Sequence, residues 1–221
     1  MSRFAPVPPY PPPIQLPTVM EPSSAPAGPV EIACVVDRSG SMDAVRTDAI
    51  GGFNSFLRQQ QALPGEARLS LVLFNHGYER VHDRRPLAEV PPLDEATYVP
   101  GGTTALLDAV GRTLHDLGNR IEAAPPAERP EKVIVAILTD GLENASRDYT
   151  YERVAGAIED RQAAGWEFVF LAANQDAIAS AARVGIGAQD AFGFVADAAG
   201  TGVAFARMAE EVSRRRGTPR S

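Results

Sequence analysis

The sequence predicts an α/β fold with a doubly wound, mostly parallel central sheet, one antiparallel edge strand and helices on both faces. From Val30 onward, short apolar runs rich in β-branched residues alternate with segments of helical spacing. Continuous apolar runs are typical of parallel strands that are buried on both faces. Because strands and helices alternate along the chain, the helices are expected to cover both faces of the sheet.

Five apolar runs indicate the parallel strands, and a more polar segment indicates the edge strand. The apolar runs cover residues 32–36, 69–74, 133–138 and 168–173, with a weaker run over 191–195 that Gly193 interrupts. The edge strand is expected over 78–84. It follows Gly77 directly, so a short hairpin would pair it with the strand before it.

Apolar residues at helical spacing lie between the strands and predict five helices. The faces of these helices are Val45, Ala49, Phe53, Phe56 and Leu57; Leu107, Val110, Leu114 and Leu117; Val154 and Ile158; Ile178 and Ala182; and Val203, Ala206, Met208 and Val212. The third helix is expected to start after the cap signal at 148–150.

The predicted organisation is one domain over residues 30–215, with a proline-rich, disordered extension over 1–29 and a tail over 216–221. Proline fixes φ and removes backbone donors, so the extension should be a linker, with a docking peptide as the alternative. The arginine run 214–216 near the end is expected to be a solvated helix end or tail rather than a binding patch.

Composition and charge exclude several functional classes. The net charge of −7 argues against nucleic acid as a partner, because phosphate binding needs a basic surface. No apolar run approaches the length of a membrane span. The first residues lead into proline rather than into a secretory signal, so the expected location is the cytoplasm. Cys34, the only cysteine, excludes an intrachain disulfide.

Three loops carry the residues that suggest chemistry. They are 37–41 (Asp-Arg-Ser-Gly-Ser), 101–104 (Gly-Gly-Thr-Thr) and 138–141 (Leu-Thr-Asp-Gly). Each lies where this architecture places a strand end or a helix start, and ligands bind at the carboxyl ends of strands in open α/β sheets. Carboxylate and hydroxyl oxygens are preferred by hard divalent cations, so the loops predict a metal site.

These three loops together resemble the metal-ion-dependent adhesion site of the von Willebrand factor type A (VWA) domain family. The resemblance covers about residues 30 to 215 and points to the intracellular bacterial members. Asp37, Ser39 and Ser41 match the family's Asp-x-Ser-x-Ser motif, Thr104 its threonine and Asp140 its last aspartate. Thr103, adjacent to Thr104, is the alternative for the threonine position.

The resemblance implies a non-enzymatic, Mg²⁺-dependent protein-binding module, with Mn²⁺ or Ca²⁺ as alternative ions. The hydroxyls would bind the ion directly, while Asp37 and Asp140 would act mostly through hydrogen bonds and bridging waters. The ion would keep a position for an Asp or Glu carboxylate of a partner protein. For intracellular relatives, the family implies AAA+ ATPases or stress-system components as partners, and neither nucleic acid nor membrane.

Each part of the predicted site also has an ordinary structural explanation. Ser41 and either threonine could cap the helices that follow, and Asp140-Gly141 is a common turn pair. Other polar residues near the same edge are candidates for its rim: Asn75, His76, Glu143, Asn144 and residues 174–176. For His76, a surface loop position is the simpler interpretation, and His82 and His115 have no ligand partners at suitable spacing.

The alternative function is an Mg²⁺-dependent phosphoryl-transfer enzyme with Asp37 as nucleophile. Such a site needs a carboxylate-rich metal cradle and usually a lysine for the phosphate. The first loop has serines where a second aspartate would be needed. The only lysine, Lys132, precedes the strand at 133–138 and so lies at the opposite end of the sheet. Both features favour the binding module.

Overall fold

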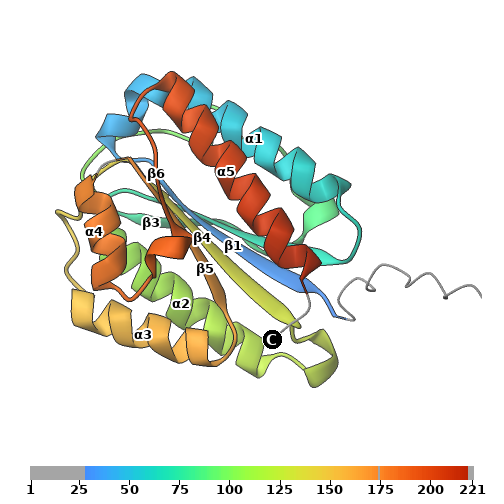
Figure 1. The fold of residues 1–221 in the computed structure, drawn as a ribbon. Helices are drawn as coiled ribbons and strands as arrows, with labels where there is room; N and C mark the ends of the chain where they lie inside the picture. The colour runs from blue at the N-terminus through green and yellow to red at the C-terminus, as the bar shows by residue number, and fades with distance from the viewer. Residues whose placement is uncertain (1–27, 174, 219–221) are drawn as a thin grey trace, which may run out of the picture.

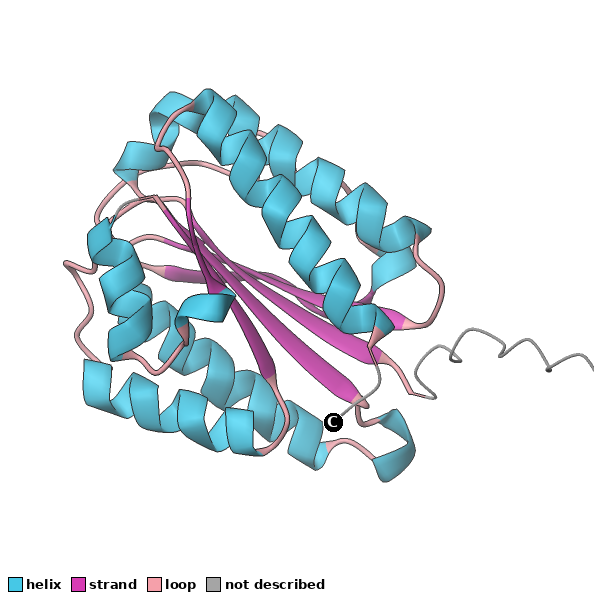
Figure 2. Ribbon diagram, viewed as in Figure 1, coloured by secondary structure: helices cyan, strands magenta, loops and turns pink. Residues whose placement is uncertain are grey.

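The computed structural model describes residues 28–173 and 175–218, apart from the side chains of residues 175–178. These residues form one central sheet between two layers of helices (Figures 1 and 2). Nearly all of the proline-rich segment lies outside the described residues. The predicted limits of the domain, its extension and its tail stay a prediction.

The sheet has six strands in the order β3-β2-β1-β4-β5-β6. In chain order they are β1 (Val30–Asp37), β2 (Ala67–Phe74), β3 (Tyr78–Pro86), β4 (Lys132–Thr139), β5 (Glu167–Ala172) and β6 (Ala191–Gly193). All neighbouring pairs are parallel except β2 and β3, which form the antiparallel hairpin at one edge. The predicted fold class is confirmed. The weakest predicted strand is shorter than expected and ends at its glycine.

Within the described residues, five α-helices flank the sheet, and short 3₁₀ turns lie in several of the connections. The helices are α1 (Arg46–Ala62), α2 (Leu106–Ala123), α3 (Tyr151–Ala163), α4 (Gln175–Arg183) and α5 (Ala198–Gly217); the turns are η1 (Gly40–Val45), η2 (Leu87–Glu89), η3 (Pro126–Glu128) and η4 (Ala188–Asp190). As the cap signal predicts, the hydroxyl of Thr150 accepts a hydrogen bond from the backbone N–H of Arg153 at the start of α3. Among the described helices, none is long and apolar enough to cross a bilayer.

Alternate side chains of β1 enter two separate cores. Ile32 and Cys34 face α1 and α5, whereas Ala33 and Val35 face α2, α3 and α4. Figure 1 shows these two helix layers on opposite sides of the sheet. This two-sided burial is the reason that the strand reads as a continuous apolar run in the sequence.

In the sheet, β1 lies between β2 and β4. On one side of β1 the sheet continues through β2 to β3, and on the other side it continues through β4 to β5 and β6. The register aligns Asp37 with Phe74 of β2 and Val36 with Leu138 of β4. The carboxyl ends of these three strands therefore meet at a topological switch point, where open α/β sheets bind ligands.

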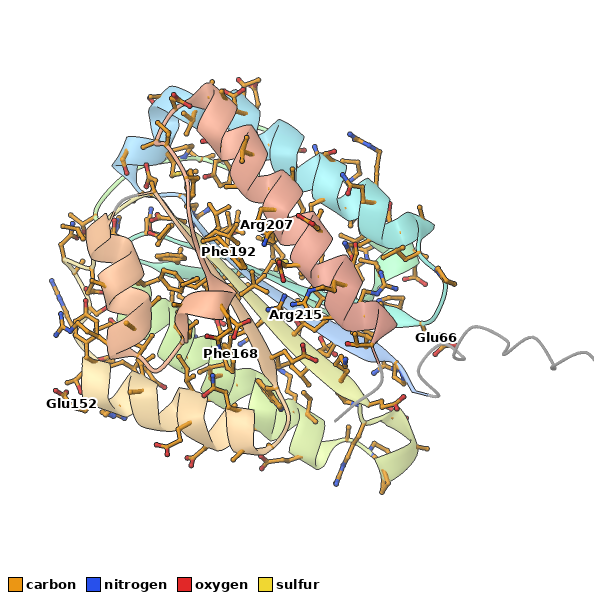
Figure 3. The ribbon with its side chains drawn as sticks, viewed as in Figure 1. Glu66, Glu152, Phe168, Phe192, Arg207 and Arg215 are labelled. Carbon is orange, nitrogen blue, oxygen red and sulfur yellow. The ribbon has the colours of Figure 1, made fainter. Side chains whose placement is uncertain are left out.

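The arginine run near the end of α5 differs from its prediction. Arg214 is exposed, but Arg215 and Arg216 are only 2% and 5% exposed. Arg215 forms ion pairs with Glu211, with Asp190 and with Glu167, and it points from α5 toward β5 (Figure 3). Two of the three arginines are therefore buried parts of the fold, not a solvated helix end.

The prediction failed because the partners of these arginines are distant in sequence. Arg216 donates a hydrogen bond to the backbone carbonyl of Gln60, 2.7 Å away at the end of α1. The acidic partners Glu167 and Asp190 belong to β5 and η4. Nothing local in a run of like charges indicates that the end of α5 crosses these elements, because the crossing is a tertiary contact.

Lys132 lies at the amino end of β4, opposite the candidate site, as the sequence predicts. Its ammonium group is buried and donates to the carbonyl oxygens of Arg215 (2.7 Å) and Thr218 (2.8 Å). It also pairs with Glu167 at 3.0 Å. Lys132 therefore fixes the last turn of α5 to the sheet and is far from the loops at the carboxyl edge.

Arg215 and Arg214 offer a matched test of this buried network. Arg215→Ala should lower the free energy of unfolding by about 1.5 to 3 kcal/mol, because it removes a buried guanidinium together with its ion pairs to Glu211, Asp190 and Glu167. Arg214→Ala removes an exposed guanidinium and should change stability by less than about 0.5 kcal/mol. Urea denaturation of both variants measures the difference. Equal losses would contradict the assignment of Arg215 to the folded interior.

Candidate metal centre

Asp37 is the last residue of β1, and its side chain is fully buried at the carboxyl edge of the sheet. One carboxylate oxygen, Oδ1, accepts the backbone N–H of Ser39 at 2.7 Å, and Oδ2 accepts the hydroxyl of Thr139 at 2.6 Å. The hydroxyl of Tyr98 donates to the backbone carbonyl of Asp37 at 2.6 Å. Both the carboxylate and the backbone of Asp37 are therefore fixed in position.

The two serines of the first loop connect Asp37 to the third loop. The Oγ atoms of Ser39 and Ser41 are 3.2 Å apart, and the Ser41 hydroxyl donates to Oδ1 of Asp140 at 2.8 Å. Because the Ser41 proton points at a carboxylate, the lone pairs of its oxygen are available to a cation. Three predicted ligands thus form one chain of oxygen atoms across two loops.

Thr104 lies beside these oxygens, and Thr103 does not. Thr104 is 3% exposed, whereas Thr103 is exposed. A Cβ atom built on Gly141 would lie 3.1 Å from Oγ1 of Thr104 and 3.9 Å from Oδ2 of Asp37. The absent side chain of Gly141 therefore leaves open a small space that the Thr104 hydroxyl and the Asp37 carboxylate both border.

Asn144 holds the backbone of Thr104 from both sides. Its Oδ1 accepts the Thr104 N–H at 2.9 Å, and its own N–H donates to the Thr104 carbonyl at 3.0 Å. These two bonds join the second loop to the third. Asn144 is therefore more than the rim residue that the sequence predicts, since it positions one of the proposed ligands.

Backbone hydrogen bonds also join the first loop to the second. The N–H of Gly40 donates to the carbonyl of Gly102 at 3.0 Å, and the N–H of Gly101 donates to the carbonyl of Arg38 at 2.9 Å. Gly102 has φ +76, and the His76 ring occupies the place where its side chain would be. Only glycine fits beside the His76 ring in this backbone conformation. The two hydrogen bonds between the first and second loops join backbone groups and involve no side chain.

Asn75, at the end of β2, supports the second loop from the other side. Its amide nitrogen donates to the carbonyl of Gly101 at 2.7 Å, and its own carbonyl accepts the N–H of Ala105 at 2.8 Å. The neighbouring His76 is exposed, as expected for a surface loop histidine. Of these two candidates at the end of β2, Asn75 is the residue that braces the site.

The hydroxyls of the site are not used to cap helices. The N-cap positions of η1, α1 and α2 are Ser39, Val45 and Ala105, and none of them has a side-chain cap hydrogen bond. The start of α2 is instead capped by Glu143, which accepts the N–H of Leu107 at 2.9 Å, and by the hydroxyl of Ser146. The capping explanation of the serine and threonine hydroxyls is therefore wrong.

Burial perturbs both carboxylates of the site. It raises the pKa of Asp37 to about 6, although hydrogen bonds from Thr139 and Ser39 act in the opposite direction. It also raises the pKa of Asp140, against the hydrogen bond from Ser41. Burial favours the neutral form of a carboxylate, so a bound cation would stabilise the ionised form.

The donor set fits a hard divalent cation better than a soft one. The predicted ligands offer three hydroxyls and two carboxylates, and oxygen donors of this kind suit Mg²⁺. Among the described residues, no group of three or more His, Cys, Asp or Glu side chains is placed to hold an ion. A cation here would depend on neutral hydroxyls, and it would keep most of its positive charge.

Other residues near the edge have structural roles. The Arg38 guanidinium turns back to pair with Glu79 of β3 at 2.6 Å. A polar hollow of about 610 Å³ beside the site is lined by residues that include His76, Thr103 and Arg147. Asn174 and the side chains of residues 175 and 176, which the sequence places at the rim, lie outside the described part.

Two supporting residues were missed by sequence reasoning. Thr139 precedes Asp140 at the end of β4, and its position in a strand next to a candidate aspartate is a usable signal. Tyr98 has no such signal, because its contact with Asp37 spans 61 residues of chain. Only the folded chain shows that the Tyr98 hydroxyl holds the backbone of Asp37 in place.

The fold of the chain is similar to that of solved VWA-type structures. The vWF domain of the type V pili tip protein Mfa5 from Porphyromonas gingivalis has a TM-score of 0.62 and 13% identity, with 88% of this chain and 98% of that chain covered. Proximal thread matrix protein 1 from the mussel byssus has a TM-score of 0.56 and 16% identity, with 87% and 48% covered. This chain thus spans about half the length of the mussel protein.

One structure of the same mussel protein contains a zinc-occupied metal-ion-dependent adhesion site. It has a TM-score of 0.54 and 16% identity, with 87% of this chain and 48% of that chain covered. No protein-family model matches the chain, and no curated protein matches its sequence. At these identities the similarity shows the VWA-like fold alone.

Asp37 should contribute to the pH dependence of the stability of the metal-free protein. Its folded pKa of about 6 is above the ordinary 3.8, so the folded state binds more protons and stability falls as the pH rises through this window. In EDTA, the free energy of unfolding of the unsubstituted protein should fall by about 3 kcal/mol between about pH 4 and pH 6.5, and Asp37→Asn should abolish this fall. Urea denaturation across this range measures it, and parallel curves for both proteins would contradict it.

Asn144 should tune metal affinity through Thr104. Asn144→Ala removes the acceptor for the Thr104 N–H and should weaken Mg²⁺ or Mn²⁺ binding by about tenfold or more, as loss of outer-shell partners does. Asn144→Asp keeps an accepting oxygen and should bind the ion at least as tightly as the unsubstituted protein. Isothermal titration calorimetry compares them. Equal weakening in both variants would show that the Thr104 contact is not the cause.

Proposed function

We propose that this VWA-like chain is an Mg²⁺-dependent protein-binding module with a metal-ion-dependent adhesion site. Asp37, Ser39, Ser41, Thr104 and Asp140 are the residues that hold the ion. The observation that carries the proposal is the convergence of these side chains from three loops, with hydroxyls that cap no helix. The zinc-occupied site of the structurally similar mussel protein supports a divalent metal at this place.

The bound cation would supply an electrophilic position for a carboxylate of the partner. Ser39, Ser41 and Thr104 contribute neutral oxygens, so they leave the charge of the ion largely uncompensated. Each carboxylate oxygen of Asp37 accepts one hydrogen bond, from the Ser39 N–H at 2.7 Å and from the Thr139 hydroxyl at 2.6 Å, so each would keep a lone pair for metal-bound water. Mg²⁺ usually keeps several waters, which suits this indirect role.

The placement of Lys132 and the composition of the site disfavour phosphoryl transfer. Lys132 is bound to Thr218 and Glu167 at the amino edge, so it does not reach the phosphate of a substrate held at Asp37. Asp37 itself is fully buried, and its carboxylate is hydrogen-bonded on both oxygens. A nucleophilic oxygen must be reached by the bulky phosphoryl group of a substrate, and a side chain without exposed surface disfavours that approach.

The class of partner protein is inferred only from the resemblance to the VWA family. An AAA+ ATPase or a stress-system component remains the predicted partner, and the bacterial, cytoplasmic setting remains a prediction. The structurally similar proteins named above are a pili tip protein and a byssus protein. Cell fractionation would decide the location independently of the metal site.

Metal titration tests the site directly. Asp37→Ala, Ser39→Ala, Thr104→Ala and Asp140→Ala should each weaken Mg²⁺ binding by about tenfold or more while the fold remains intact. Thr103→Ala is the matched control, because this neighbouring hydroxyl is exposed and should not affect binding. Calorimetry measures the affinities and circular dichroism the fold. Unchanged affinity in both Thr104→Ala and Asp140→Ala would refute the site.

Capture of a partner tests the function. A pull-down should recover a protein in Mg²⁺ but not in EDTA, and Asp37→Ala should recover none. A phosphatase assay run in parallel separates the two functional classes. Metal-dependent turnover that disappears in Asp37→Asn would overturn the binding-module proposal in favour of catalysis.

A further inference from the structure

A hollow of about 540 Å³ lies at the amino edge of the sheet, opposite the candidate metal centre. Its walls come from the end of α1, the start of β2, the segment around η2 and the end of α5. Its apolar lining residues are Pro29, Leu63, Ala67, Pro86, Leu87 and Ala88. The volume is in the range of ordinary ligand pockets.

The hollow adjoins the point where the described chain begins. Pro29 forms part of its wall, and the N–H of Val30 donates to the carbonyl of Glu66 at 2.9 Å. Figure 3 shows Glu66 beside this first part of the described chain. A segment that precedes Pro29 therefore starts at the hollow.

Arg216 contributes a buried guanidinium to the lining. It is 5% exposed, and its Nη1 donates to the carbonyl and to Oε1 of Gln60 at 2.7 and 3.2 Å. Its Nη2 has only a long contact of 3.4 Å to the carbonyl of Gly65, and no described residue accepts its Nε–H. Nε and Nη2 form one edge of the planar group, and such an edge binds a carboxylate through two parallel hydrogen bonds.

Arg215, the residue before it, shows what Arg216 lacks. Both guanidinium groups are buried, but Arg215 pairs with three carboxylates. Arg216 forms no ion pair with a described residue, and burial lowers its pKa without a carboxylate that acts against this effect. Buried charges in proteins are normally paired, so the Arg216 guanidinium is suited to an anionic ligand.

The other charged residues of the hollow leave this preference intact. They are Glu66 and Arg68, whose formal charges cancel. Arg216 therefore gives the hollow its net positive charge, beside an apolar wall. A matching ligand would carry a carboxylate among apolar residues.

The chain itself contains such a segment directly before the hollow. Residues 1–27 precede the described part and include one acidic residue, Glu21. Val19, Met20 and Pro22 surround it. An extended chain spans about 26 Å between Glu21 and Pro29, so the carboxylate is within reach of the hollow.

We propose that the hollow binds the segment of this chain around Glu21, with the Glu21 carboxylate on the Nε and Nη2 edge of Arg216. The apolar neighbours of Glu21 cover the apolar wall. Because a short connection attaches the segment, its effective concentration is about millimolar, and a weak contact is enough for occupancy. The site lies at the other edge of the sheet from the proposed metal and does not depend on it.

Disulfide formation in the full chain tests the proximity. Ser23→Cys keeps the Glu21 carboxylate, and Ala88→Cys places a thiol on the exposed wall of the hollow. This pair should oxidise about tenfold faster or more than Ser23→Cys with Ala182→Cys, an exposed position of α4 in the other helix layer. Cys34 is buried and should not compete.

Removal of the charge tests the role of the carboxylate. Glu21→Gln, added to the pair of Ser23→Cys and Ala88→Cys, should slow its oxidation to about the rate of the control pair. Non-reducing electrophoresis measures the rates and separates monomers from disulfide-linked dimers.

A double-mutant cycle locates the partner of Glu21. Glu21→Gln and Arg216→Gln, alone and combined, are compared by urea denaturation of the full chain. Their effects on the unfolding equilibrium constant should be coupled by about tenfold or more, as for a hydrogen bond to a charged group. Arg68→Gln is the matched control, because this arginine lines the same hollow and should show no coupling. The cycle cancels the stability that Arg216→Gln loses by itself.

Each result decides for or against the proposal. Equal oxidation of the two cysteine pairs, or rapid oxidation that persists in Glu21→Gln, overturns it. Coupling with Arg68 instead of Arg216, or with neither, overturns the assignment of the carboxylate. Rapid oxidation that yields disulfide-linked dimers makes the segment of a second copy the occupant, and overturns binding within one chain.

Discussion

The carboxyl edge of the sheet depends on one buried carboxylate. Asp37 ends β1 with its side chain inside the protein, where it binds Ser39 of its own loop and Thr139 of the adjacent strand. A buried carboxylate must be hydrogen-bonded, protonated or paired with a cation. The first of these conditions ties two loops together, and the last is the one that the proposed metal ion would meet.

The surrounding loops are ordered mainly by backbone and amide hydrogen bonds. Gly40 and Gly101 join the first two loops, and Asn144 joins the second to the third. Glu143 satisfies the start of α2, a task that serine and threonine hydroxyls often perform. Because other groups perform these tasks, the serine and threonine hydroxyls of the proposed site do not cap the helices that follow them.

The two ends of the sheet hold buried charge in different ways. At the amino edge, Lys132 and Arg215 are buried and form ion pairs with acidic side chains, which fixes α5 to the sheet. At the carboxyl edge, Asp37 accepts hydrogen bonds from Ser39 and Thr139, and burial raises the pKa of both Asp37 and Asp140. The proposed cation would favour the ionised form of both carboxylates.

The sequence by itself determined the fold class, the hairpin edge and the candidate ligands, because these depend on local periodicity and on short motifs. Continuous apolar runs identify buried strands, and Asp37, Ser39 and Ser41 are neighbours in the chain. Only the tertiary structure decided which groups support them. Tyr98, Asn144 and the buried Arg215 act through contacts across 61, 40 and 25 residues. Such contacts leave no local pattern, since they arise when strands distant in sequence become neighbours in the sheet.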